Sequence, residues 1–521
     1  MAIKTKPLFK SNNIIAKPRL ALLAVLMAGG AIFVLLSHAQ ASHSSAGCIK
    51  SSSDYSSCVT GSAEMQISRL YVYALNRLPD NSGLQYFVTQ NVRKSMALQQ
   101  IAAQIIASAE YANLHKTPTT ADQLAAASQG QAFRDSHDQQ ISAFVGNFYS
   151  QLPAADMSTT GTGRFGIATG GEFAGVVKSN TADFSKTVDV INNSGAQWAR
   201  ATIRWDWVEP KRPNADGTHN YNWDVSDRLV KDFRLNGINL LLNINPATAP
   251  AWASQSTTTV TNKYVDGDQS IANTTSNGPL VGNVKDYSSY VAAVVARYKT
   301  NGVKYWQIGN EPNRADAWPS TNSDQARIDN YLAYLIAGHD SVHGADQLAR
   351  VLTAGMGGNS DKIAGNISAP TFITKMYDTL YRQHRNPDDV FDIVSFHPYS
   401  YPGRSTDWPD GHQEILQVRD IMRFVGDGEK KIWATEFGAP TSVVSEVQQA
   451  KVLTDTYAND AQYDWLGPMF WYQIRGYRTQ SDDQYNKNTF GLVRPDYSPK
   501  PAYCSLQRLT GATSSSKCAS L

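Results

Sequence analysis

The sequence predicts an α/β protein: a (β/α)8 barrel over residues 164–510, preceded by a small all-helical domain. From Arg164 onward, short apolar runs alternate with amphipathic helical segments, and eight strands each followed by a helix is the pattern of such a barrel. Several of the helical segments end in Gly, as helix stops do. A doubly wound sheet also alternates strands and helices, but no glycine-rich phosphate turn follows the first strand. We therefore favour the barrel.

Length and composition set the outer bounds. The 521 residues are too many for one ordinary domain. With 42% hydrophobic and 18% charged residues, the chain has the composition of a globular protein with a substantial core. The formal net charge is only +2, from 47 Lys and Arg against 45 Asp and Glu. That balance gives no reason to expect nucleic acid or an acidic membrane surface as a partner.

The N-terminus predicts export. Basic residues between Lys4 and Arg19 precede an apolar run over 20–36, and Ala39-Gln40-Ala41 supplies the small residues of a cleavage site. This order describes a secretory signal over residues 1–41. Because the apolar run is near the lower limit for spanning a bilayer, an uncleaved signal anchor is the competing interpretation. We expect an exported protein that is secreted, periplasmic or associated with the cell envelope.

Four cysteines fit an exported chain: Cys48, Cys58, Cys504 and Cys518. Four cysteines allow three connectivities. The local pairs Cys48–Cys58 and Cys504–Cys518 would staple the two ends of the mature chain. Four free thiols in a reducing compartment are the alternative, which the export signal disfavours. No CxxC motif or Cys/His cluster suggests a metal site.

Residues 60–117 predict a small helical domain, and the Ala-, Gln-, Ser- and Thr-rich residues 118–163 predict a linker. MQISRLYVYALNRLPD has apolar residues near helical spacing, and after a turn at 79–83 come GLQYFVTQNV and LQQIAAQIIASAEY. PDNSG has too few carboxylates for a calcium loop. LYVYALNRLPDNSGLQYFV together with residues 108–111 resembles a helical module catalogued as domain of unknown function 4214. The resemblance implies a surface or secretion-related accessory without chemistry.

The strands of the barrel are expected in the apolar runs of the second half of the chain. They are RFGIATG from 164, AQWARATIR from 196, INLLLNI from 238, YWQIGNEP from 305, VLTAGMG from 351, DIVSFHPY from 392, KIWATEFGA from 431 and GPMFWYQI from 467. WDVSDRLVKDFRLNG, DYSSYVAAVVARYKTNG and EILQVRDIMRFVG are among the intervening helices. A long polar insertion, from Pro250 to Lys285, follows the third strand.

Two of the eight strands end in glutamate, Glu311 on the fourth and Glu436 on the seventh. Active sites of such barrels lie at the C-terminal strand ends, and these two strands lie nearly across the mouth from one another. Paired carboxylates flanking a cleft suit glycosidic bond hydrolysis, because one protonates the leaving oxygen while the other attacks the anomeric carbon or activates a water. A single glutamate would more often form a salt bridge, so the prediction rests on the pair.

These glutamates stand in family motifs. IGNEP and ATEFG closely resemble the catalytic signatures of clan A retaining glycoside hydrolases. GAQWARATIRWDWVEP, FDIVSFHPYSYP and MFWYQI are similar to the second-, sixth- and eighth-strand motifs. By pattern the nearest relatives are glycoside hydrolase family 39 and its neighbours, which include β-xylosidases, α-L-iduronidases and exported enzymes that cut exopolysaccharides. The resemblance implies that Glu311 is the general acid/base and Glu436 the nucleophile.

The resemblance also implies supporting residues around the nucleophile. Asn310 would hydrogen-bond the 2-hydroxyl of the sugar, and Arg200 would hold the nucleophile ionised. His397 and Tyr399 alternate on the sixth strand and would support the nucleophile by hydrogen bonding. Trp471 would form the aromatic floor of the cleavage subsite. An ion pair for Arg200, a satisfied buried His397 and a core Trp471 are the structural alternatives.

The function that we expect is an exported retaining glycosidase, acting by double displacement and without metal or cofactor on an extracellular or envelope polysaccharide. We favour endo action because the rim loops are long. An exo-acting β-xylosidase-like enzyme, its cleft closed by the insertion between Pro250 and Lys285, is one alternative. A non-catalytic carbohydrate-binding or adhesion protein, suggested by the helical module, is the other. The expected partner is a polysaccharide or oligosaccharide, with envelope association through the N-terminal region.

Overall fold

The computed structural model describes residues 62–151 and 162–518. Excepted are 95, 116–118, 171–172, 174–176, 178–180, 255–258, 267–268, 277–283, 316, 319–322, 359–360, 362–364, 404–409, 477, 480–488 and 514–517. The predicted signal over residues 1–41 and the Cys48–Cys58 pair lie outside the described residues. Within them, no helix combines the length and the apolar character that a membrane span requires.

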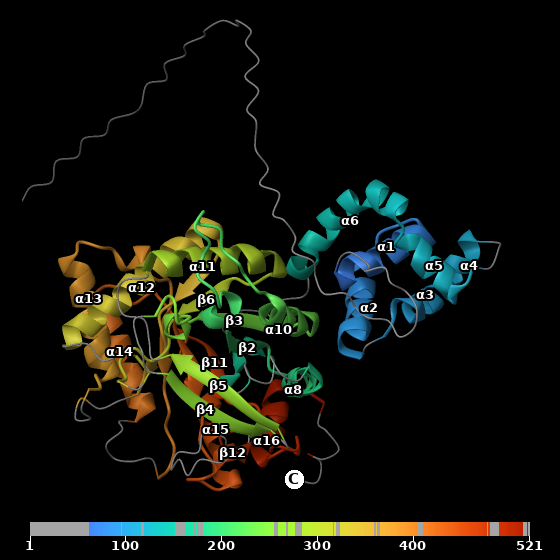
Figure 1. Ribbon diagram of the computed structural model, residues 1–521. Helices are drawn as coiled ribbons and strands as arrows, with labels where there is room; N and C mark the ends of the chain where they lie inside the picture. Colours follow the sequence, from blue (N-terminus) through green and yellow to red (C-terminus); the bar gives the residue numbers. More distant parts are fainter. Residues whose placement is uncertain are drawn as a thin grey trace, which may run out of the picture. The chain divides into compact units, whose positions relative to one another are not determined.

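A nine-stranded parallel sheet forms the centre of the barrel (Figure 1). Its strands are hydrogen-bonded in the order β7-β6-β3-β2-β1-β11-β10-β9-β8. Its strands are β1 (Phe165–Ala168), β2 (Trp198–Thr202), β3 (Asn239–Ile244), β6 (Tyr305–Ile308), β7 (Arg350–Leu352), β8 (Met356–Gly357), β9 (Val394–His397), β10 (Ile432–Phe437) and β11 (Leu466–Tyr472). All eight predicted strands are found, and the fifth is split into β7 and β8.

The split fifth strand closes the sheet on itself. β7 pairs with β6 and β8 pairs with β9, so the two outer strands of the sheet are consecutive pieces of one chain segment, residues 350–357. Isolated bridges join Leu352 to Ile393 and Asn310 to Gly355 on either side of the interruption. The prediction of a (β/α)8 barrel is therefore confirmed.

One principal helix follows each of the eight barrel strands, with β7 and β8 taken as one interrupted strand, and packs around the sheet (Figure 1). These helices are α8 (Thr181–Asn193), α10 (Asp224–Leu235), α11 (Val284–Tyr298), α12 (Asp324–Ala345), α13 (Ala369–Arg382), α14 (Gly411–Phe424), α15 (Glu446–Asp460) and α16 (Pro501–Thr510). Helix α13 shows why they form. Ser368 caps its first turn by accepting the N–H of Thr371, and Phe372, Ile373, Met376 and Leu380 give it one buried face. Short turns α9 (Trp205–Val208), η1 (Thr162–Arg164), η2 (Pro246–Thr248), η3 (Lys299–Asn301) and η4 (Pro387–Asp389) complete the barrel.

The barrel interior is filled with aromatic side chains. Trp198, Trp433 and Phe470 are buried against one another, with Tyr305 packed beside them. Neighbouring strand residues such as Trp306 belong instead to the core between sheet and helices, as the alternation of a strand requires. Burial of each such ring stabilises the fold by about 1.5–3 kcal/mol. The interior layer gives the mouth above it a rigid base.

The polar insertion after the third barrel strand contains a hairpin, β4 (Thr259–Asp266) and β5 (Gln269–Ser276). Strand β4 also pairs with β12 (Arg478–Thr479), which follows β11. The three-stranded sheet β12-β4-β5 thus joins the segments that follow the third and the eighth barrel strands.

The N-terminal region is helical, and it is longer than predicted. Its helices are α1 (Ala63–Leu75), α2 (Asn81–Lys94), α3 (Leu98–Ile106), α4 (Ala109–Leu114), α5 (Ala121–Ser128) and α6 (Gln131–Gln151). Residues 118–163 were expected to be a linker, but α5 and α6 occupy much of that range. Ala and Gln are good helix formers, and Leu124 and Phe148 are buried in one core with Ile67 and Leu70 of α1. That core explains why the stretch is ordered.

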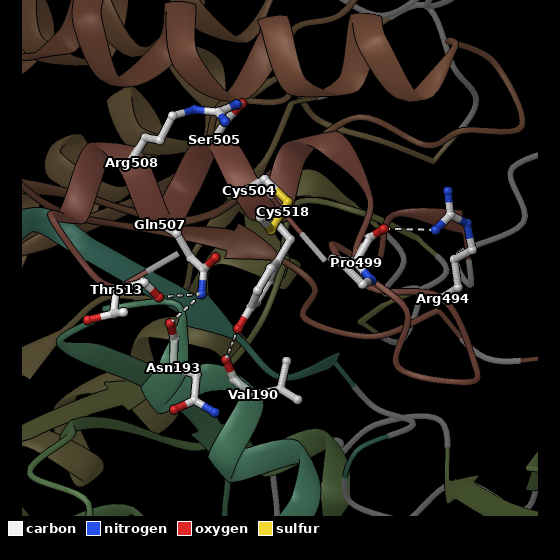
Figure 2. The surroundings of a disulfide bond; sticks show 11 residues. Val190, Asn193, Arg494, Pro499, Cys504, Ser505, Gln507, Arg508, Thr513 and Cys518 are labelled. Carbon is white, nitrogen blue, oxygen red and sulfur yellow. Dashed lines mark hydrogen bonds between the residues drawn. A yellow bond between two sulfur atoms is a disulfide. The ribbon is translucent and has the colours of Figure 1, made fainter. Parts of the chain in front are cut away.

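A disulfide fastens the C-terminal segment, as predicted for Cys504 and Cys518 (Figure 2). Their Cα atoms are 5.4 Å apart and both side chains are buried. From the same helix, the Gln507 side-chain amide donates to the carbonyls of Asn193 and Thr513 (Figure 2). Helix α16, the last of the barrel, is thereby tied to the end of α8, the first.

Candidate active site

Glu311 is aimed by an unusual backbone at the end of β6. Gly309 has φ +90°, a conformation that favours glycine, and Glu311 itself has φ +46°. The N–H of Glu311 donates to the carbonyl of Gly355 at 3.0 Å. A non-glycine residue at positive φ costs about 1–3 kcal/mol and persists only where the surroundings enforce it. Here the hydrogen bond to Gly355, in the interruption of the fifth strand, holds this backbone conformation. The Glu311 carboxylate consequently lies at the mouth of the barrel.

Glu436 is aimed by an irregularity in β10. Ala434 pairs with Met469 and Phe437 with Trp471, so three steps along β10 match two along β11. The extra residue is a β-bulge, which changes the face to which the following side chains point. Phe437 joins the core between sheet and helices, while the Glu436 side chain remains 13% exposed at the mouth. Simple alternation along the strand would not have placed Glu436 there.

The two predicted glutamates meet at one histidine. Nδ1 of His397 lies 2.9 Å from Oε1 of Glu311 and 3.7 Å from Oε2 of Glu436. One oxygen of each carboxylate and one ring nitrogen of His397 all lie within 4.8 Å of one another. An oxygen of each carboxylate is thus near enough to the other for both side chains to act on one bound group.

Arg200 joins three of the barrel strands beneath the mouth. The side chain is buried, and Arg200 lies on β2. Its guanidinium donates hydrogen bonds to Glu436 Oε1 at 2.6 Å, Asn310 Oδ1 at 2.7 Å and Gln307 Oε1 at 2.5 Å. The predicted residues Arg200, Asn310 and Glu436 are thus brought together in one hydrogen-bonded set.

Tyr399 supplies a second donor to Glu436. Its hydroxyl donates to Oε2 at 2.9 Å. Burial, followed by the negative charge of Glu436, raises the pKa of Tyr399 well above its ordinary value. The phenol therefore keeps its proton, and with it the hydrogen bond, well into the alkaline range.

His397 is completely buried, and a glycine makes the room for it. A Cβ built on Gly355 would lie 2.0 Å from Nε2 of His397 and 2.6 Å from Oγ1 of Thr435. Nε2 has no hydrogen-bond partner among the described residues. Since an ionised carboxylate only accepts hydrogen bonds, Nδ1 carries the proton whenever Glu311 is ionised.

Trp471 is not in the cleft, contrary to the expectation. It is fully buried between sheet and helices, its indole N–H donates to the carbonyl of Phe490, and its ring packs edge-on against Phe437. The neighbouring Tyr472 points to the barrel interior instead. Tyr472 lies close enough to Tyr399 to contribute to its raised pKa, after burial and Glu436. The aromatic residue of the eighth strand that faces the site is therefore Tyr472.

The sequence reasoning also missed Gln307, Thr435 and Arg314. The side-chain amide of Gln307 accepts from Arg200 and donates to Thr435 Oγ1 at 3.1 Å. The signal for Gln307 was available, because a buried amide inside an apolar strand is rarely without a partner. Arg314 forms an ion pair with Glu311, its Nε lying 3.4 Å from Oε2.

Glu311, His397 and Glu436 could together offer three ligand atoms to a cation. The guanidinium of Arg200, bonded to Glu436, places a positive charge beside this set and opposes a second cation. The same arrangement suits two carboxylates that act on a bound organic group.

A family model matches part of the chain. It is a glycoside hydrolase family 42 model, described as beta-galactosidase, and it matches residues 178–333. The matched span includes Arg200, Asn310 and Glu311 but ends before Glu436. No curated protein gives a match.

Several solved structures share the fold. A monomeric beta-xylosidase from Caulobacter crescentus CB15 aligns with a TM-score of 0.50 and 15% identity, over 70% of this chain and 71% of its own. A family 39 enzyme from Xanthomonas axonopodis pv. citri gives 0.50 and 16%, over 70% and 68%. A family 39 glycoside hydrolase from Bacteroides cellulosilyticus WH2 aligns with a TM-score of 0.48 and 20% identity. The alignment spans 68% of this chain but only 65% of the length of that protein. The family match supports a glycosidase, and the two neighbours with a TM-score of 0.50 show that the barrel fold is shared.

Proposed function

We propose that the protein is an exported retaining glycosidase that hydrolyses O-glycosidic bonds of an extracellular or envelope polysaccharide. The observation that carries the proposal is the glutamate pair at the mouth, with an oxygen of each carboxylate and a nitrogen of His397 within 4.8 Å of one another. That closeness fits attack by one carboxylate on the sugar better than attack by an interposed water.

In the first step Glu436 attacks the anomeric carbon. A bond forms between its carboxylate oxygen and that carbon, the bond to the leaving oxygen breaks, and Glu311 donates its proton to that oxygen. Arg200 and Tyr399 both donate hydrogen bonds to Glu436. These two donors fix the direction of the nucleophile.

In the second step a water molecule replaces the enzyme. Glu311, now ionised, takes one proton from the water as the oxygen attacks the anomeric carbon, and the bond to Glu436 breaks. Asn310, whose Oδ1 accepts a hydrogen bond from Arg200 at 2.7 Å, binds the 2-hydroxyl of the sugar in this mechanism. In place of Trp471, Tyr472 supplies the aromatic surface on which the sugar stacks.

Chemical rescue tests the assignment of the two glutamates. Glu436→Ala should reduce turnover of every substrate by several orders of magnitude, because the covalent step is lost. Glu311→Ala should still form the glycosyl-enzyme from an aryl glycoside with a good leaving group, and azide should restore turnover with retention of configuration. Azide rescue of Glu436→Ala with an inverted product, and none for Glu311→Ala, would show that the roles are reversed.

Endo action is the form that we propose, and export follows from the predicted signal over residues 1–41. One observation favours the exo alternative: pairing of β4 with β12 joins the segments after the third and eighth strands, which would narrow one side of the mouth. Sizing of the products after brief digestion separates the two modes. Oligosaccharides at the outset support endo action, and monosaccharide alone contradicts it.

A further inference from the structure

Arg314 touches the carboxylate to which the acid/base role is assigned. Its Nε lies 3.4 Å from Oε2 of Glu311, while the other oxygen of Glu311 faces His397 at 2.9 Å. The Arg314 side chain is 26% exposed, whereas that of His397 is completely buried. Glu311 therefore lies between a deep histidine and a permanent cation on the solvent side.

The turn that carries Arg314 is held in place by Asn313, which is fully buried. The Asn313 amide donates to the carbonyls of Gly357 at 2.7 Å and Ile367 at 3.0 Å, and its oxygen accepts the N–H of Gly357 at 3.0 Å. The stem of Arg314 rests on Gly357, since a Cβ built there would lie 2.8 Å from its Cδ. The base of the Arg314 side chain therefore stays beside Glu311.

The contact opposes the first chemical step. Glu311 must carry a proton when the glycosidic bond breaks, and an arginine, which stays charged at every working pH, favours the ionised carboxylate. The acid step becomes more favourable if Arg314 changes partner when the substrate binds. A second carboxylate, brought by the substrate, is the group that would compete best for a guanidinium.

We propose that Arg314 binds a carboxylate on the leaving-group sugar, so that the substrate is a uronate-containing polysaccharide. The inference rests on the proposed function, and it names the substrate class of the same site. The departing sugar lies beside Glu311 because Glu311 protonates its oxygen. Arg314, in contact with Glu311, is next to the site of that sugar. When Arg314 turns to the uronate, the cation leaves Glu311 and the acid form becomes favourable. A neutral sugar leaves the ion pair in place and reacts more slowly.

Binding by a variant that cannot turn over tests the inference. Full-length Glu311→Gln protein is titrated by calorimetry with alginate, polygalacturonate, glucuronoxylan and hyaluronan. Each polymer is also tested after carboxyl reduction, which keeps the linkages and removes the charge. We expect at least one acidic polymer to bind at least tenfold more tightly than its reduced form. The preference should disappear in Glu311→Gln/Arg314→Gln and be kept in part by Glu311→Gln/Arg314→Lys.

Arg212→Gln in the same background is the matched control. Arg212, on the loop after β2, packs over the ring of Trp252. Its replacement by Gln changes the net charge by the same amount as Arg314→Gln. It should leave the preference for the acidic polymer unchanged. A loss equal to that of Arg314→Gln would show a general effect of charge and overturn the inference.

The result that overturns the inference differs from the result that overturns the glycosidase. Equal binding of acidic and reduced polymers, or no binding of any acidic polymer, overturns the role of Arg314. Wild-type cleavage of neutral glycans, scored separately, would then still support the glycosidase. Conversely, absence of cleavage on every glycan counts against the enzyme, while a preference that depends on Arg314 would still establish the uronate site.

Discussion

At the scale of single residues, the mouth of the barrel depends on side chains that bond several partners at once. Arg200 binds Glu436, Asn310 and Gln307, and the amide of Gln307 passes the network on to Thr435. One guanidinium thus bonds residues of β6, of the turn that follows β6, and of β10. Individual contacts can still be tested one at a time.

Tyr399→Phe removes one of the two donors to Glu436. We expect kcat to fall by about 10- to 100-fold, because a donor aimed at a reacting carboxylate is lost, while the folded structure changes little. Since the raised pKa of Tyr399 keeps its proton in place, the alkaline limb of the wild-type pH–rate profile should be the same in Tyr399→Phe. A shift of that limb in the variant would show that Tyr399 itself titrates during catalysis.

Asp460→Asn tests a buried carboxyl away from the mouth. Burial raises the pKa of Asp460 to about 6, although the nearby His412 lowers it. The folded state therefore holds the proton more tightly than the unfolded chain, and wild-type stability falls as the pH rises from about 4 to about 6. Asn removes that loss, so the free energy of unfolding at pH 7.5 should increase by about 1–2 kcal/mol.

Urea unfolding at pH 4 and pH 7.5 measures the effect, and the gain should vanish at the lower pH. Asp455→Asn is the control, because Asp455 is half exposed on the same helix and pairs with Lys451. A gain for Asp460→Asn that is equal at both pH values would contradict the assignment.

At the scale of elements, the interrupted fifth strand links the helix layer to the site. Between β7 and β8 side chains replace strand hydrogen bonds: the hydroxyl of Tyr331 on α12 accepts the N–H of Ala354 at 2.6 Å, and Oγ1 of Thr353 accepts the N–H of Ser395 at 2.9 Å. The next residue, Gly355, accepts the N–H of Glu311 and makes room for His397. Tyr331 is thus a positioning residue one step from the glutamate.

Tyr331→Phe leaves the N–H of Ala354 without that acceptor. The loss should destabilise the protein by about 1–3 kcal/mol. It should also lower kcat with little change in KM, since the position of Glu311 shifts while the sugar-binding surface remains. Tyr334→Phe, one turn further along α12 and equally buried, is the matched control for stability. An unchanged kcat in Tyr331→Phe would show that the strand gap does not position Glu311.

The elements themselves were largely predictable, because strand lengths, helix stops and the two glutamate motifs are local properties of the sequence. The faces of the strands were less so. In MFWYQI three aromatic residues stand in a row, so apolar character could not decide that Trp471 faces the helices and Tyr472 the interior. The bulge beside Glu436 also breaks the alternation on which such a choice depends. Residues 118–163 were misjudged because a composition rich in Ala and Gln suits linkers and helices alike.

At the scale of the whole molecule, the chain closes its barrel between its first and last helices. Gln507 and Thr510 of α16 donate to the carbonyls of Asn193 and Ser194 at the end of α8. The close contact requires Gly195, which has φ +76° and whose added Cβ would lie 2.3 Å from Oγ1 of Thr510. The Cys504–Cys518 disulfide links Cys518 to α16, the helix that makes these contacts.

Cys504→Ala/Cys518→Ala should lower the stability without touching the chemistry. A disulfide that closes a loop with a sequence separation of 14 contributes about 3 kcal/mol by limiting the unfolded chain. We expect the Tm to fall by roughly 5–10 °C, with kcat at 25 °C unchanged. Thermal unfolding of the wild type with and without a reductant is the control. A Tm unaffected by both treatments would show that the helix contacts alone hold the segment.

The same C-terminal fastening bears on how the protein can be attached to a surface. The C-terminal ends of α8 and α16 lie at the N-terminal ends of the barrel strands, whereas Glu311 and Glu436 lie at the opposite rim of the barrel. A solid support or fusion partner coupled near Cys518 would therefore leave the glutamate rim turned outward, open to a long polymer. The disulfide would transmit a force applied at Cys518 to helix α16 rather than to the loops that form the mouth.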